Sequence, residues 1–271
     1  MAARFAYALT DRRPHSIFPY TSAEAIAPPP LLTGHHAGCV EERHDFGNAC
    51  EFDGKLSLAH FRSRYLLYAR ANTKPAGGGR FVQVASSLAD DPSSSYGPFR
   101  LLSIDGYDRK GPGNIYLACV NPHPADDTML IGAFAVNLGD PHPHSHPHAD
   151  GDAHTRPDDG NTDGPSFIGI SLSCNGVDWS QLTPAAPSIG SLGRTYDQPV
   201  DGLLTIDATS SDATIGAEAA GGPITYLLIH KDVYGIAPSA RQTSRIVRHA
   251  IMPRALRRLA RAARARGLPG C

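Results

Sequence analysis

Short runs of alternating hydrophobic and polar residues fill the middle of the chain, and turn-forming residues separate them. Alternation of this kind is typical of half-buried β-strands. It predicts a first group of four strands at residues 55–61, 65–70, 81–86 and 98–102. The pattern returns at 115–120, 129–134, 167–172 and 179–182, and a third round has runs at 200–204, 224–229 and 245–248. The chain is therefore predicted to consist of repeated four-stranded antiparallel units.

Repeated four-stranded units indicate a β-propeller, because one blade cannot bury both of its faces and must stack on its neighbours. The Asn175-Gly176 pair supports the repeat, since Asn-Gly is a strong hairpin signal. We expect an all-β fold of the five-bladed propeller type. Only about three blades can be counted in roughly 200 residues. The ring is therefore incomplete, contains degenerate blades or draws further strands from the N-terminal stretch.

Three parts can be distinguished along the chain. Residues 1–48 show little periodicity and are expected to be an irregular N-terminal segment, and residues 49–250 form the predicted propeller domain. Within that domain, residues 139–165 are a low-complexity, His-rich insertion that we expect to be disordered. Residues 251–271 form a basic tail, with a short helix over 254–266 after Pro253 and before Gly267.

Composition and charge narrow the function classes. The 271 residues are 41% hydrophobic and 19% charged, which suits a globular domain with a sizeable core. The net charge is −1, and without the six arginines of the 254–266 helix it would be −7. That helix could contact an anionic surface or nucleic acid, but a solvated basic face explains it as well. We expect no nucleic-acid partner, no membrane span and a monomer.

The five cysteines, at positions 39, 50, 119, 174 and 271, are odd in number and scattered. This argues against a disulfide framework and against a cysteine-type zinc site. Residues 1–10 are too short and too weakly apolar for a secretory signal. The N-terminal sequence is compatible with a weak organellar leader. The compartment is therefore left open between the cytoplasm and an organelle.

Polar residues cluster near the predicted first strand of each blade, which in a propeller faces the central channel. Glu51 and Asp53 precede the first, and Asp197 and Asp201 accompany the third. The second blade and the ends of neighbouring strands add the remaining candidates: Arg70, Asp108, Asn114, Asn121 and His230. Acids that converge from separate blades are what glycoside hydrolysis needs, with one as general acid and another as base or nucleophile.

Residues 50–58 (CEFDGKLSL), 65–72 (YLLYARAN) and 197–202 (DQPVDG) resemble the glycosyl-hydrolase-type five-bladed propellers of the arabinanase, levansucrase and invertase superfamily. The resemblance spans roughly residues 48–248. It implies an Asp at the first blade as base or nucleophile, an Asp at the second that tunes the transition state, and a Glu at the third as acid. Asp53 matches the first role, whereas the other blades offer Asn114, with Asp108 as the nearest acid, and Asp201 in place of Glu.

This resemblance implies a carbohydrate-active protein that acts on or binds a glycan or a small sugar. Asp53 would be base or nucleophile, and Asp201, or else Glu51, the acid with a raised pKa. The substrate would be bound by Arg70, Asp108, Asn114, Asn121, Asp197 and His230. The alternative is a non-catalytic propeller that binds glycans or proteins, or a decayed partial hydrolase.

Two further features have simpler interpretations. The histidines at 142, 144, 146, 148 and 154 are of a type that suits zinc, copper or nickel, but the prolines between them prevent a compact cage. We therefore expect no metal and no cofactor. Trp179, at a predicted blade turn, is expected to be a core aromatic residue rather than a sugar platform.

Overall fold

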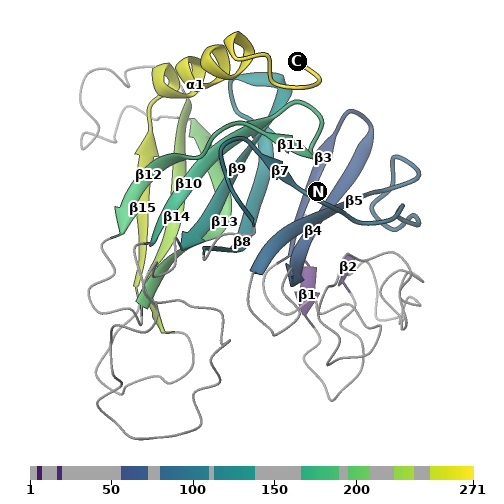
Figure 1. Ribbon diagram of the computed structural model, residues 1–271, viewed down its shortest axis with the longest axis horizontal. Coiled ribbons are helices and arrows are strands. Elements are labelled where there is room, and N and C mark those ends of the chain that lie inside the picture. The colour runs from purple at the N-terminus through teal and green to yellow at the C-terminus, as the bar shows by residue number, and fades with distance from the viewer. Residues whose placement is uncertain are drawn as a thin grey trace, which may run out of the picture.

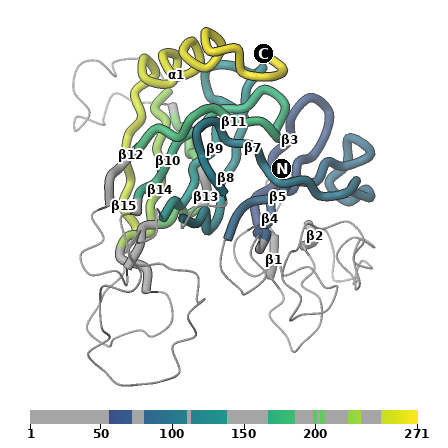
Figure 2. Tube along the Cα trace, in the orientation of Figure 1, coloured from purple at the N-terminus to yellow at the C-terminus, as the bar shows by residue number. Residues whose placement is uncertain are grey.

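The computed structural model describes residues 5–7, 17–19, 56–72, 80–109, 113–137, 166–188, 195–207, 223–234 and 245–271. Figure 2 draws most of them in colour. They are mostly β-strand, with one α-helix near the C-terminus (Figure 1). None of the helices in this part of the chain is long or apolar enough to cross a membrane.

The first sheet follows the chain in the order β3 (Ser57–Phe61), β4 (Arg64–Asn72), β5 (Arg80–Ser86) and β6 (Arg100–Leu101). Neighbouring strands of this sheet all pair in the antiparallel direction. The turn between β3 and β4 is made by Arg62 and Ser63, whose φ angles of 51° and 56° are those of a tight hairpin turn. The four predicted strands are confirmed.

The second sheet has the order β12-β10-β9-β8, with β8 (Asn114–His123), β9 (Asp126–Asn137), β10 (Ser166–Ser173) and β12 (Thr183–Ser188). Its fourth strand was expected at 179–182 but begins at Thr183. The reason is that β11 (Asp178–Trp179) pairs in parallel with β7 (Ser103–Ile104), just beyond the first sheet. This short pair connects the two sheets.

The third sheet contains β13 (Thr195–Asp207), β14 (Pro223–Tyr234) and β15 (Arg245–Ile251), in that order. The predicted helix is confirmed as α1 (Pro253–Ala265), which starts with Pro253 and is followed by Gly267 at a φ of 70°. Two short strands, β1 (Phe5–Tyr7) and β2 (Ile17–Pro19), pair with each other near the N-terminus. The described strands form separate open sheets and close neither a barrel nor a propeller.

β8 holds the three sheets together. It contacts β3 and β5 of the first sheet as well as β13 of the third. The Val120 N–H donates to Ser57 Oγ at 2.9 Å, and the Leu203 N–H donates to Asn121 Oδ1 at 2.9 Å. The first strands of successive sheets therefore lie next to one another, although they belong to different hydrogen-bonded ladders.

Two large hydrophobic clusters fill the spaces between the sheets. One lies between the first and second sheets and contains Tyr68, Phe134 and Trp179, whose rings meet edge to face. Trp179 is only 1% exposed, so its predicted place in the core is confirmed. The other cluster joins the second and third sheets to the apolar face of α1. The helix is thus part of the fold and covers one end of it (Figure 1).

A disulfide bond joins Cys174, in the turn after β10, to Cys271. The cysteine count had argued against such bonds, and that inference was wrong here. Parity and spacing say nothing about two residues 97 positions apart that the fold of α1 and its tail brings together. Cys119 is a buried thiol whose sulfur lies 3.5 Å from the Pro199 carbonyl oxygen. Cys39 and Cys50 lie outside the described residues.

Candidate functional site

The predicted site residues are spread along β8, and Asn114 is the first residue of this strand. This strand begins at Asn114 and ends at His123, and Asp126, just after His123, makes an ion pair with Arg264 of α1. Asn114, the first residue of β8, therefore lies at the end of this strand away from the helix. There it sits beside the start of β5, because the Arg80 N–H donates to Asn114 Oδ1 at 2.8 Å. Asn114 is 2% exposed and links the first sheet to the second.

Two arginines converge on one aromatic ring next to Asn114. The guanidinium carbon of Arg80 lies 5.0 Å from the centroid of the Tyr116 ring, and that of Arg70 lies 5.7 Å from it. Arg70 is buried, and its carbonyl accepts a hydrogen bond of 2.8 Å from Gln83 Nε2. Contacts of this kind hold cations in place over a ring. Guanidinium groups offer forked donors that suit carboxylates and pairs of hydroxyl oxygens.

The candidates of the third sheet lie at different levels along β8. Cys119 of β8 lies against Pro199 of β13, and Asn121 lies against Leu203, so the two strands run in the same direction. Asp197 therefore stands closer to the Asn114 end of the molecule than Asp201, which lies between the two contact points. His230 of β14 pairs with Gln198 and so belongs to the same region.

The two remaining candidates of the second blade, Asn121 and Asp108, differ in burial and in the element that carries them. Asn121 is half-buried and uses its side-chain oxygen to accept the Leu203 N–H, which is a structural role. Asp108 is exposed in the turn after β7. Burial of the neighbouring Tyr107 is the larger cause that raises the pKa of its phenol, and the negative charge of Asp108 adds to it. Together they raise this pKa to about 12. The Tyr107 phenol is therefore neutral at physiological pH.

Two of the three candidate catalytic acids, Glu51 and Asp53, lie outside the described residues. So do the histidines of the 139–165 insertion. Within the part of the chain that the structure describes, no three His, Cys, Asp or Glu side chains are grouped so as to hold a metal ion.

Sequence reasoning missed Arg80 and Tyr116. Tyr116 stands two positions after Asn114, and the two-residue period of a strand puts both on the same face of β8. That signal was available once Asn114 had been chosen. Arg80 directly follows three glycines, in the stretch between two predicted strands. Nothing local indicates that it opens β5 next to β8, since this depends on how the two sheets pack.

No protein-family model and no curated protein sequence matches this chain. One solved structure, described as a complex of BT0996 and RGII, is similar with a TM-score of 0.32 and 14% sequence identity. The similarity covers 80% of this chain and 53% of the other protein, so the chain spans about half the length of that protein. A similarity at this TM-score does not establish a shared fold.

Proposed function

We propose that this chain is a carbohydrate-active protein with a propeller-type arrangement, and that its glycan site lies at the Asn114 end of β3, β8 and β13. One observation carries the proposal: the first strands of three successive antiparallel sheets lie next to one another, with β8 between the other two. Propeller blades place their first strands in the same way around a central channel.

The residues at this end suit glycan recognition. Arg70 and Arg80, held by the Tyr116 ring, would donate hydrogen bonds to sugar hydroxyl or carboxylate oxygens. In a hydrolase, Asp53 would be the base or nucleophile and Asp201, or else Glu51, the acid. Such a pair needs its carboxylates roughly 5–10 Å apart.

A second candidate function, glycan binding without hydrolysis, is favoured by Asn114. Where the resembling hydrolases carry an Asp, this chain has a neutral amide whose oxygen already accepts the Arg80 N–H. The amide therefore cannot supply the negative charge that tunes the transition state. In this case the arginines and Tyr116 would hold the glycan, and no reaction would follow.

The test is a panel of oligosaccharides, assayed for hydrolysis by product release and for binding by calorimetry. For a hydrolase, we expect Asp53→Asn and Asp201→Asn to lower the rate by about 10²–10⁴ while glycan affinity changes little. For a binding protein, no variant hydrolyses any glycan, and Tyr116→Leu weakens binding. Asp127→Asn is the control, because Asp127 is exposed on β9 near the opposite end. A protein that neither binds nor cleaves any glycan of the panel would refute the proposal.

A further inference from the structure

A pocket of about 250 Å³ lies at the other end of the molecule, below the C-terminal turn of α1. One side is formed by residues of β7, β11 and their flanks: Ser103, Asp105, Asp178, Trp179 and Ser180. The other side is formed by α1 and by the tail that follows it. The pocket lies against the end of α1, whereas Asn114 begins β8 at the end of this strand away from α1, so the pocket is separate from the proposed glycan site.

Strand alternation explains why one wall of the pocket is polar. In the parallel pair of β7 and β11, Ser103 is opposite Asp178 and Ile104 is opposite Trp179. Ile104 and Trp179 are buried in the core. Because successive side chains of a strand point to opposite faces, Ser103 and Asp178 point away from the core, and both line the pocket.

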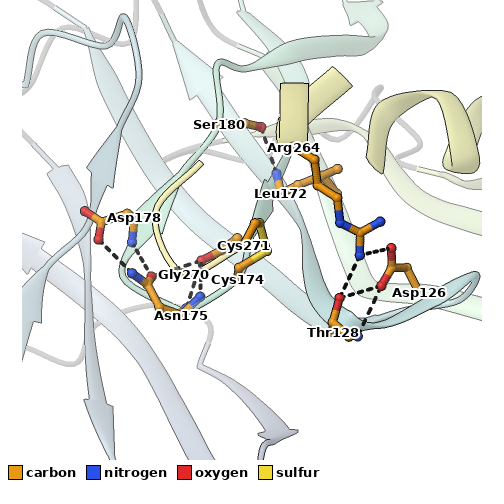
Figure 3. The surroundings of a disulfide bond; sticks show 12 residues. Asp126, Thr128, Leu172, Cys174, Asn175, Asp178, Ser180, Arg264, Gly270 and Cys271 are labelled. Atoms are coloured by element: carbon orange, nitrogen blue, oxygen red, sulfur yellow. Dashed lines mark hydrogen bonds and ion pairs between the residues drawn. A yellow bond between two sulfur atoms is a disulfide. The ribbon is translucent and has the colours of Figure 1, made fainter. Parts of the chain in front are cut away.

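Asp178 is held in position by the turn before it. Its Oδ2 accepts a hydrogen bond of 2.8 Å from Asn175 Nδ2 (Figure 3). The Oδ1 of Asn175 in turn accepts the N–H groups of Val177 and Asp178 at 2.9 and 2.8 Å. Within the described residues, the other oxygen of the Asp178 carboxylate makes no hydrogen bond. The turn thus presents a fixed carboxylate at the pocket.

The second wall is built by the end of the chain. Gly267 ends α1 with a φ of 70°, Leu268 is buried beneath the tail, and Cys271 is bonded to Cys174. Arg266 lines the pocket and donates to Gln181 Oε1 at 3.1 Å. The disulfide therefore fastens a wall that otherwise depends on one buried leucine and a few hydrogen bonds (Figure 3).

We propose that this pocket binds a small organic cation of the size of an amino sugar. Asp105 and Asp178 give the lining two negative charges against the single positive charge of Arg266, so a ligand with one positive charge balances it. The volume is below the range of about 300–1,000 Å³ typical of drug-sized ligands. The two carboxylates hold the amine, Ser103 meets a hydroxyl group, and Leu268 contacts the carbon skeleton.

Three probes with one skeleton and different charge test this directly: glucosamine, glucose and glucuronate, titrated at pH 6.5, where the amine of glucosamine is protonated. Isothermal titration calorimetry measures the affinity of each probe, and the variants below locate the binding. We expect glucosamine to bind at least about 10-fold more tightly than glucose, because hydrogen bonds between its charged amine and the carboxylates change the affinity by about this factor. Glucuronate should bind most weakly, because its negative charge is repelled by the two carboxylates.

The variants separate a charge effect from a loss of structure. Asp105→Asn and Asp178→Asn should each weaken glucosamine binding about 10-fold or more, with Asp127→Asn as the unchanged control. Arg266→Gln should strengthen glucosamine binding, whereas a collapsed pocket would weaken it. Equal binding of glucosamine and glucose, full binding by both aspartate variants, or no binding at all would overturn the inference. Tyr116→Leu should leave glucosamine binding unchanged, so the failure of either site can be recognised independently.

Discussion

The bond between Cys174 and Cys271 should make a large contribution to the stability of this fold, and Cys271→Ser is the substitution that measures it. Cys174 is fully buried in the cluster beneath α1, whereas Cys271 is exposed. A serine at 271 therefore leaves its hydroxyl in water, and it removes the cross-link without placing a new polar group in the core.

The expected size follows from the length of chain that the bond closes. A loop of 97 residues corresponds to about 4.7 kcal/mol in the chain-entropy account of disulfides. Measured contributions of disulfides are usually smaller than this figure, about 2–4 kcal/mol. We therefore expect a net loss of about 2–4 kcal/mol, and a Tm lower by about 5–15 °C.

The assay is urea and thermal unfolding of the oxidised protein, with the bond verified by mass spectrometry. Pro269→Ser, in the same exposed tail, keeps both cysteines and should stay within about 0.5 kcal/mol of the wild type. If Cys271→Ser also stayed within about 0.5 kcal/mol, the tail would be held by its other contacts alone. The reasoning from loop closure would then be wrong.

Three further substitutions probe other parts of the molecule. Burial lowers the pKa of His123. The contribution of the neutral imidazole to stability is therefore present above the unfolded pKa of about 6.5 and is lost as the pH falls below that value. Between pH 7 and pH 5, the Tm of His123→Gln should fall less than the Tm of the wild type. Asn121→Ala leaves the Leu203 N–H without its acceptor and should cost about 1–3 kcal/mol in urea unfolding, and Asn121→Asp less. A Cβ at Gly132 would meet two core aromatic rings at 2.5 and 2.8 Å, so Gly132→Ala should cost about 1–3 kcal/mol, whereas Gly97→Ala, with no atom nearer than 3.8 Å, should be nearly neutral.

The strands could be predicted because their signal is local. The alternation at 65–70 lies within β4, and that at 129–134 lies within β9. The helix could be predicted for the same reason, since Pro253 and Gly267 mark its ends in the sequence itself. In each case neighbouring residues specify the element, and no distant contact has to be known.

The parts that could not be predicted depend on contacts between distant segments. The sequence at 103–104 and 178–179 does not indicate that these residues pair in parallel, so the fourth strand of the second sheet was misplaced. At the candidate site, Asn114 and Asn121 were chosen as polar residues at a channel. Their side-chain oxygens instead accept backbone N–H groups of the two flanking sheets, a need that arises only when those sheets pack against β8.

The two ends of β8 differ in what holds them, and this bears on which variants can be studied. At the helix end, the disulfide, the buried face of α1 and the Arg264–Asp126 ion pair of 2.6 Å all act together. At the Asn114 end, the described contacts between the sheets include one hydrogen bond and the arginine contacts with Tyr116. Both ends are therefore held by contacts between segments that are far apart in the sequence. A substitution at either end should be checked by urea unfolding before a change in ligand binding is interpreted.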